Sequence, residues 1–85
     1  MEQYKVYIKR SAGKELGRIR EKDRKKVIEK IRSLSFEPRP VGVKKLSGEE
    51  KYRLRQGDYR ILYKIEAEIV TVTVVRIAHR REVYR

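Results

Sequence analysis

The sequence predicts an α+β fold: an N-terminal strand, a helical hairpin and a three-stranded antiparallel meander that together form one four-stranded sheet. Apolar and polar residues alternate over 4–9 and again over 51–64, which indicates strands. Apolar residues recur at helical spacing between 12 and 34, and a β-branched run, IVTVTVVRI, fills 69–77. The 85 residues suffice for a single domain, 1–85, with one modest core.

Two helices are expected after the first strand. Ser11 is the predicted N-cap of a short helix over about 12–20. Asp23 is the predicted N-cap of a second helix, which ends before Pro38. The apolar residues expected to cover one face of the sheet are Leu16, Ile19, Val27, Ile28, Ile31 and Leu34.

The segment KYRLRQGDYRILY, residues 51–63, predicts a β-hairpin. Gly57 supplies the positive φ that a tight reversal requires, and Asp58 tolerates turn geometry. Residues 37–48 are expected to be a connector, and residues 65–68 a second reversal. The face of the sheet turned away from the helices is expected to carry Arg53, Arg55, Arg60 and Arg76.

The composition favours a polyanionic partner. The net charge is +12 and the pI is near 10.2, so nucleic acid, ribosomal RNA or an acidic protein segment is expected to bind. The absence of cysteine excludes disulfides, thiolate nucleophiles and zinc–thiolate sites. No signal peptide, transmembrane run or membrane-surface helix is evident in the sequence, so a soluble cytoplasmic protein without a membrane partner is expected.

The side chains available for chemistry favour RNA cleavage without a metal or other cofactor. Guanidinium groups stabilise the extra negative charge of a phosphorane, and a histidine or tyrosine can transfer protons. The C-terminal segment HRREVYR supplies His79, Arg80, Arg81 and Tyr84, which would meet Arg53 and Arg60 if the tail folded back over the sheet. Ser47, His79 and Asp58 are the residue types of a hydrolase triad, but nothing in the sequence places them together.

The order of elements, the segment VKKLSG, the hairpin YRLRQGDYRILY and the tail HRREVYR together resemble the RelE toxins of the RelE/ParE toxin-antitoxin superfamily. The resemblance covers nearly the whole chain. It implies a ribosome-dependent mRNA endonuclease, an mRNA interferase that cuts the A-site codon by attack of the 2′-OH and so inhibits translation. It also implies two partners, a cognate acidic RelB-like antitoxin in a hetero-oligomer and a 70S-type ribosome.

The resemblance also implies which residues act. The catalytic set carried over by motif is Arg53, Arg60, His79, Arg80 and Tyr84. The residues expected to bind RNA or the ribosome are Lys25, Lys26, Lys44, Lys45, Lys51, Arg55 and Arg81. Some relatives use lysine where this chain has Arg53 and Arg55, and arginine is a poor base. The general base would then be His79, Tyr84 or Lys51.

Two other functions stay open. ParE-type relatives share the fold and act on DNA gyrase, which makes a gyrase inhibitor the main alternative. A plain RNA-binding module without catalysis is the second. The tail HRREVYR favours the nuclease, because a gyrase inhibitor has no use for a cluster of histidine, arginine and tyrosine.

Overall fold

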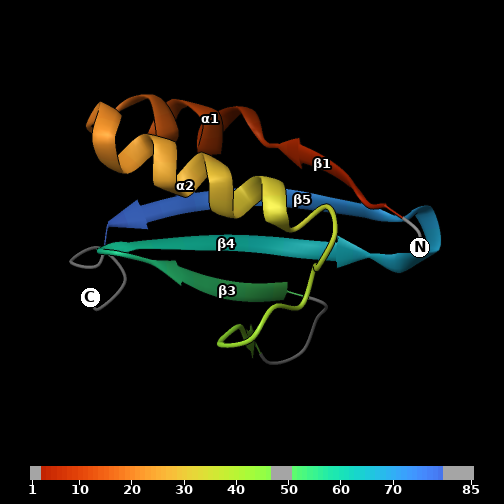
Figure 1. The fold of residues 1–85 in the computed structure, drawn as a ribbon. Coiled ribbons are helices and arrows are strands. Elements are labelled where there is room, and N and C mark those ends of the chain that lie inside the picture. Colours follow the sequence, from red (N-terminus) through yellow and green to blue (C-terminus); the bar gives the residue numbers. More distant parts are fainter. Residues whose placement is uncertain (1–2, 47–50, 80–85) are drawn as a thin grey trace.

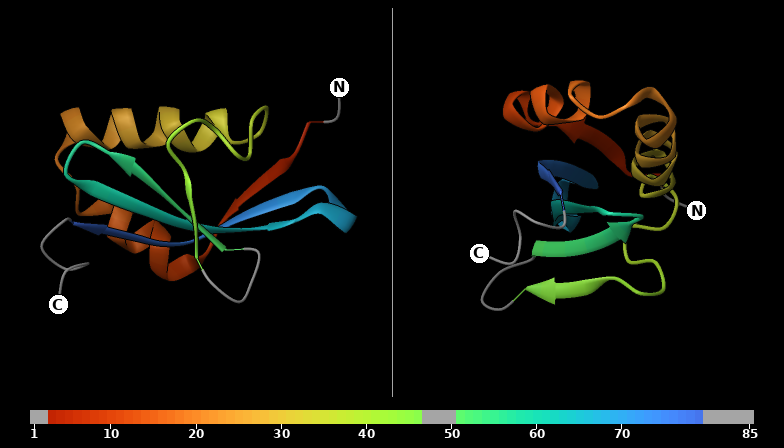
Figure 2. Two further views of the ribbon diagram at one scale, coloured as in Figure 1. Left: turned by 90° about the horizontal axis from the view of Figure 1, so that it is seen from below. Right: turned by 90° about the vertical axis from the view of Figure 1, so that its left-hand side faces the viewer.

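The computed structural model describes residues 3–46 and 51–79, and it shows two helices stacked on one face of a mixed sheet (Figures 1 and 2). This confirms the predicted α+β class. In chain order the elements are β1 (Lys5–Ile8), α1 (Arg10–Gly17), α2 (Glu21–Ser33), β2 (Lys44–Leu46), β3 (Lys51–Gln56), β4 (Tyr59–Glu66), the 3₁₀-helix η1 (Ala67–Ile69) and β5 (Thr71–His79).

The sheet has five strands in the order β1-β5-β4-β3-β2, one more than predicted. β1 runs parallel to β5, and the other neighbours are antiparallel. The additional strand is β2, which lies inside the expected connector and pairs with β3. Its three residues, KKL, are too few to show an alternating pattern, so only pairing across space reveals it.

The core lies between the helices and the covered face of the sheet. Ile19, Val27, Ile31 and Leu34 are buried there as predicted, whereas Leu16 and Ile28 are half-buried. Their partners on the sheet are Tyr52, Leu54, Ile61, Tyr63, Ile65, Val72, Val74 and Ile77. These residues alternate along their strands, except at Val74 and Ile77, where the pairing of β4 with β5 shifts between Leu62 and Tyr63. Where the alternation holds, the intervening residues face away from the helices.

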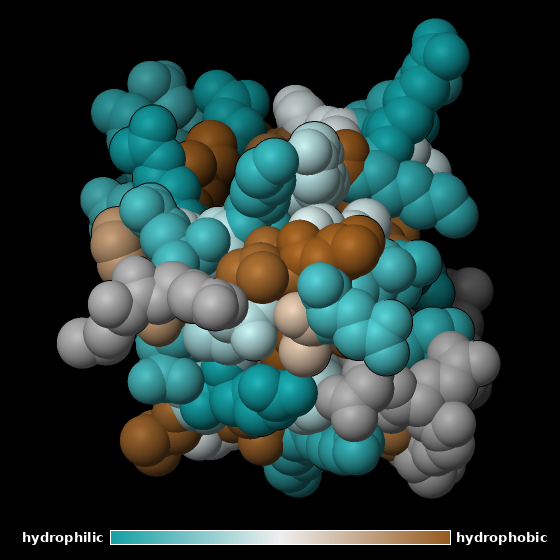
Figure 3. Space-filling view, turned by 90° about the vertical axis from the view of Figure 1, so that its right-hand side faces the viewer, coloured by the Kyte–Doolittle hydropathy of each residue, from teal (hydrophilic) through white to brown (hydrophobic). Residues whose placement is uncertain are grey.

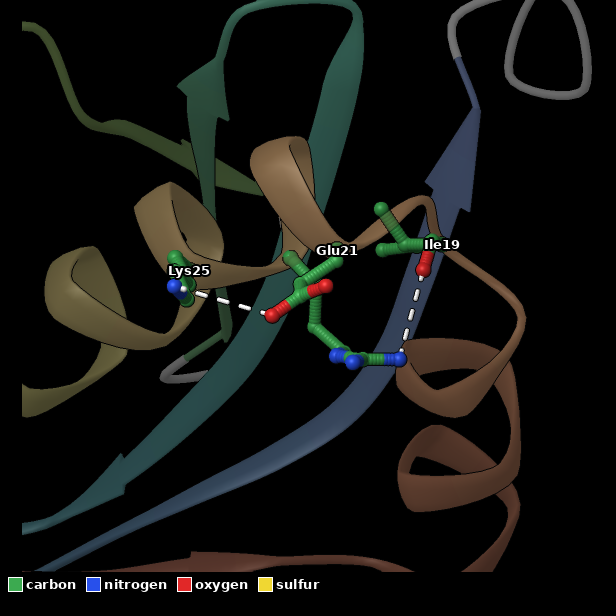
Figure 4. A network of polar contacts seen from close by, with 4 residues as sticks. Ile19, Glu21 and Lys25 are labelled. Atoms are coloured by element: carbon green, nitrogen blue, oxygen red, sulfur yellow. Dashed lines mark hydrogen bonds and ion pairs between the residues drawn. The ribbon is translucent and has the colours of Figure 1, made fainter.

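The predicted helix caps are wrong. Lys9 precedes α1 and Arg20 precedes α2, and neither side chain caps its helix. Ser11 and Asp23 lie inside the first turns instead. Figure 4 shows the start of α2, where Lys25 Nζ lies 3.6 Å from Glu21 Oε1 and the Arg24 guanidinium donates to the Ile19 carbonyl at 3.5 Å. Glu21 and Asp23 are the acidic residues of this first turn, and their negative charges interact favourably with the positive end of the helix dipole.

The two reversals around β4 differ in strain. Gly57 has φ 59°, which confirms the predicted glycine turn between β3 and β4. The second reversal is η1, and it ends at Val70 with φ 48°. A left-handed conformation is unfavourable for a β-branched residue. The Val70 carbonyl accepts a hydrogen bond from the Lys5 amide at 2.9 Å, which joins this strained turn to β1.

Glu15 on α1 completes the edge of β5. β1 pairs with β5 only as far as Val74, so the Ile77 amide needs another acceptor. Glu15 Oε1 accepts from this amide at 2.9 Å, and Oε2 lies 3.6 Å from Arg76 Nε. The carboxylate therefore fixes α1 against the C-terminal end of β5.

We expect Glu15→Ala to lower the free energy of unfolding by about 1–3 kcal/mol, because it removes the acceptor of a part-buried amide. Glu15→Gln retains an acceptor and loses only the half-exposed ion pair, so its loss is expected below about 1 kcal/mol. Urea denaturation of the two variants measures both values. Equal losses in the two variants would show that the hydrogen bond to Ile77 contributes nothing.

Candidate functional site

One face of the sheet is not covered by the helices, and we call it the outer face (Figure 1). Strand pairing shows which residues share it. Arg53 lies opposite Lys44 on one side and Leu62 on the other, and Arg55 lies opposite Arg60. The sheet therefore brings together basic residues from three strands. The alternation of the hairpin predicted those on β3 and β4.

Lys44, Arg53, Arg55, Arg60 and Gly42 line a cavity of about 260 Å³, which we call the basic pocket. Four cationic side chains converge on it. The four positive charges repel one another. Together they create a focused positive potential that attracts the phosphates of a polyanion. Guanidinium groups can each present two donors to a phosphate group.

The three arginines of the basic pocket differ in exposure. Arg60 is 4% exposed, Arg53 is half-buried and Arg55 is exposed. Arg55 Nε lies 3.4 Å from the Gly57 carbonyl, a long hydrogen bond to the hairpin turn. Arg60 faces the predicted side of the sheet, but its burial was not expected from the sequence. A buried guanidinium is held in place by its surroundings, which suits it to stabilise a charge at a fixed position.

The segment between α2 and β2, residues 34–43, contributes Gly42 to the lining of the basic pocket. The Tyr63 hydroxyl donates to the Pro38 carbonyl at 2.7 Å, and Arg39 Nε donates to the Tyr52 hydroxyl at 3.0 Å. The Tyr52 and Tyr63 rings stack with centroids 5.7 Å apart. These contacts fix the backbone of the segment that leads from α2 to Lys44.

The hydroxyl of Tyr63 is buried within this arrangement. Burial raises the pKa of Tyr63 far above its ordinary value of 10.0, and the nearby Tyr52 raises it further, while Arg39 lowers it in part. Tyr63 is therefore a neutral hydrogen-bond donor over the whole physiological range.

His79 does not face the basic pocket. It pairs with Tyr59 at the end of β5, on the side of the sheet that the helices cover. Its ring meets the Tyr59 ring edge-on at 5.3 Å. A cavity of about 210 Å³ there is lined by Glu15, Arg18, Ile19, Tyr59, Ile77 and His79. The expected meeting of His79 with Arg53 and Arg60 on one face is therefore wrong, because strand pairing directs its side chain to the opposite face.

The other predicted site residues lie in several places. Lys51 lies on the outer face, opposite Lys64. Lys45 pairs with Tyr52, a position that belongs to the opposite face, and it is exposed. Lys25 and Lys26 are exposed on α2, and Lys26 lines a small cavity of about 160 Å³ beside the turn between β3 and β4. Ser47, Arg80, Arg81 and Tyr84 lie outside the described residues.

The sequence did not indicate how close Lys44 lies to the arginines. It was predicted only as an RNA-binding residue of a connector, whereas the structure places it across from Arg53 and in one pocket with Arg60. Lys64 on the same face was also missed. The alternation of β4 carries the signal for Lys64, but no local pattern carries one for Lys44.

A larger cavity of about 740 Å³ lies away from the basic pocket, between β1 and α2. It is mostly apolar, and its lining includes Tyr4, Val6, Ile8, Ile28, Ile31 and Phe36. Figure 3 views the end of the molecule near the N-terminus and shows apolar side chains exposed among hydrophilic ones. Phe36 is 73% exposed.

Within residues 3–46 and 51–79, no helix has the length and apolar character to cross a membrane. The same residues contain no group of three or more histidine, cysteine, aspartate or glutamate side chains arranged to hold a metal ion.

Comparison with known proteins agrees with this architecture. A family model described as the ParE toxin of the type II toxin-antitoxin system parDE matches residues 6–84. The chain belongs to the RelE/ParE superfamily of toxins. This confirms the resemblance inferred from the hairpin and the tail.

Among superfamily members, toxin RelG of Mycobacterium tuberculosis is 42% identical over 55 residues, which are 61% of this chain and 61% of RelG. The match thus spans less than two thirds of that relative. The RelBE2 toxin-antitoxin complex of M. tuberculosis contains a chain with 33% identity and a TM-score of 0.81, and the alignment covers 92% of this chain and 99% of that chain.

Two further solved structures contain similar chains. One is the archaeal RelE-RelB complex of Pyrococcus horikoshii OT3, with a TM-score of 0.84, 27% identity, and coverage of 92% and 96%. The other is the isolated E. coli RelE toxin, with a TM-score of 0.79, 27% identity, and coverage of 95% of this chain and 90% of that chain.

Proposed function

We propose that this chain is the toxin of a type II toxin-antitoxin pair and acts as a ribosome-dependent mRNA endoribonuclease, which cuts the A-site codon and stops translation. The observation that carries the proposal is the basic pocket, where Lys44, Arg53, Arg55 and Arg60 converge on the uncovered face of the sheet. The similarity to chains of RelE structures at 27% and 33% identity supports it.

The proposed reaction needs no metal. A base removes the proton of the 2′-OH, the 2′-oxygen attacks the adjacent phosphorus, the bond from phosphorus to the 5′-oxygen breaks, and an acid delivers a proton to that 5′-oxygen. The products are a 2′,3′-cyclic phosphate and a 5′-hydroxyl. Arg60 and Arg53 stabilise the negative charge that develops on the phosphoryl oxygens, and Arg55 and Lys44 bind the flanking phosphates.

Proton transfer requires a different kind of side chain, because arginine does not give up its proton. Lys51, Tyr84 and His79 are the candidates. Lys51 lies on the outer face with the basic pocket, whereas His79 lies on the covered face. We therefore assign proton transfer to Lys51 or Tyr84, and Arg80 remains a proposed second charge-stabilising group.

The helical side of the molecule is proposed to contact ribosomal RNA. Residues 9–32 contain eleven lysines and arginines against four acidic residues. Lys25 and Lys26 lie on this side, while Lys51 lies on the outer face and Lys45 at the exposed edge strand β2. Binding through charge density alone requires no specific geometry. Arg81 completes the proposed contact set.

The proposed protein partner is an acidic, partly helical antitoxin. Its segment would fold over the basic surface and neutralise it, forming a hetero-oligomer. The similar chains of P. horikoshii and M. tuberculosis were solved in complexes with antitoxins, which supports this part of the proposal.

A reconstituted translation reaction tests the proposed activity. The purified protein is added, RNA 5′ ends are mapped by primer extension, and naked mRNA is treated in parallel. We expect cuts within translated codons only, with a cyclic phosphate at the new 3′ end. Cuts on naked RNA as well would indicate a ribonuclease that acts without the ribosome. Intact mRNA in both reactions would refute the proposal.

The alternative is a ParE-type inhibitor of DNA gyrase, and the match of a ParE toxin model to residues 6–84 favours it. A supercoiling assay with purified gyrase distinguishes the two. Inhibition of supercoiling together with intact mRNA would establish the alternative. An RNA-binding module without catalysis would retain binding and show neither activity.

A further inference from the structure

The outer face extends well beyond the basic pocket, and strand pairing arranges its side chains in rows across the sheet. The row nearest the turn between β3 and β4 contains Ala78, Arg60 and Arg55. The middle row contains Arg76, Leu62, Arg53 and Lys44. The third row, which we call the distal row, contains Tyr7, Thr73, Lys64 and Lys51.

Positive charge continues from the basic pocket into the distal row. Lys51 and Lys64 lie opposite each other there. Glu66 is the acidic neighbour of Lys64, with its Oε1 3.7 Å from Lys64 Nζ, and both side chains remain almost half exposed. The three rows thus contain seven cationic side chains and no acidic one, and one of the seven, Arg76, is paired with Glu15 of α1. A surface of this sign fits a nucleic-acid backbone.

Tyr7 is the aromatic side chain at the end of the distal row. It is 56% exposed, and it pairs with Thr73 on the outer face, whereas its neighbours Val6 and Ile8 face the helices. Its ring lies outside the core cluster. Among the described residues, no ring contact or hydrogen bond engages its side chain.

An exposed tyrosine on a strand is common, and what distinguishes Tyr7 is its position. Neighbouring strands lie about 4.8 Å apart and residues rise about 3.3 Å along a strand. Tyr7 is two strands from Arg60 and level with Lys64, so Tyr7 and Arg60 are about 16 Å apart on the outer face. A single-stranded RNA that leaves the basic pocket along this face would reach Tyr7 within a few nucleotides.

We propose that single-stranded RNA crosses the outer face from the basic pocket to β1, and that Tyr7 stacks on a base a few nucleotides from the phosphate bound by Arg60. This inference rests on the proposed function for its substrate. Lys64 of the distal row holds the backbone, and Tyr7 supplies a flat surface that accepts any base. Tyr7 is therefore a substrate-positioning residue, distinct from the groups that act on the phosphate.

The first test is the affinity of the purified chain for a short labelled single-stranded oligoribonucleotide at low salt, followed by fluorescence anisotropy. Tyr7→Ala is expected to weaken binding at least fivefold, the lower end of what stacking on an aromatic residue contributes (about 1–3 kcal/mol per base). Tyr7→Phe retains the ring and should bind within about twofold of the parent. Ile8→Ala, on the opposite face of β1, is the matched control and should bind like the parent.

A scan with oligoribonucleotides that each lack one base locates the stacked base. At one position, loss of the base should weaken binding to the parent and have no further effect on Tyr7→Ala, as expected for two groups in direct contact. Equal affinities of Tyr7→Ala and the parent, or equal losses for Tyr7→Ala and Tyr7→Phe, would overturn the proposal.

This result is separate from the test of cleavage. If Tyr7→Ala loses affinity but the parent leaves mRNA intact during translation, stacking stands and the nuclease fails. If the parent cuts mRNA and Tyr7→Ala binds RNA as the parent does, the nuclease stands and the role of Tyr7 is refuted.

Discussion

Replacement of Arg60 by alanine is expected to reduce the rate of mRNA cleavage about 10²–10³-fold, the effect of removing one preorganised donor to a developing negative charge. Arg60 is 4% exposed and lines the basic pocket together with Arg53 and Arg55. A side chain fixed by its surroundings stabilises a charge without reorganising during the reaction. Cleavage rates in the reconstituted translation reaction at saturating ribosomes measure the effect.

Two further variants make the Arg60 experiment specific. Arg60→Lys keeps the charge but loses the planar guanidinium, so only part of the lost rate should return. Glu68→Ala removes an exposed charged side chain from η1, away from the basic pocket, and should cut at the parental rate. Thermal unfolding of each variant checks that the fold is intact. An Arg60→Ala protein that melts like the parent and cuts as fast would refute the role of Arg60.

Tyr63→Phe is expected to lower the free energy of unfolding by about 1–3 kcal/mol at neutral pH. The substitution removes the hydroxyl that donates to the Pro38 carbonyl at 2.7 Å, and this buried acceptor then loses its partner. Since the same hydrogen bond holds the segment that leads to Lys44, the variant should also bind RNA more weakly. Urea denaturation and RNA affinity measure the two effects.

The pH dependence of this difference provides a second test. The folded state raises the pKa of Tyr63 above its ordinary value of 10.0, so the folded state retains this proton after the unfolded chain has lost it. The contribution of Tyr63 is therefore fully present below pH 10 and declines above it by about 1.4 kcal/mol per pH unit. The stability advantage of the parent over Tyr63→Phe should shrink above pH 10. A constant difference up to higher pH would contradict the buried position of the hydroxyl.

Much of the candidate site could be predicted from the hairpin alone. Strict alternation in KYRLRQGDYRILY places Arg53 and Arg55 on one face and Tyr52 and Leu54 on the other, and the structure agrees. Gly57 sets the turn and thereby the register, which brings Arg55 opposite Arg60. These features are local, and hydrophobic burial of one face selects between the two faces.

Other features depend on contacts between distant segments. β2 is a strand only because β3 lies beside it, and this pairing brings Lys44 to the arginines. The orientation of His79 follows from its pairing with Tyr59 on the adjacent strand, and the burial of Arg60 is not signalled by the alternation of β4. The helix starts were also mispredicted, since Ser11 and Asp23 favour caps in isolation while the observed helices begin earlier.

The sequence by itself determined the α+β class, the helical hairpin, the central hairpin and the presence of a basic outer face, because periodicity and turn residues act over short distances. Only the tertiary structure decided which cations meet in one pocket, which face His79 occupies, and how Tyr7 is placed in line with the lysines of β3 and β4. These depend on strand order and register, which arise from pairing between segments far apart in the chain.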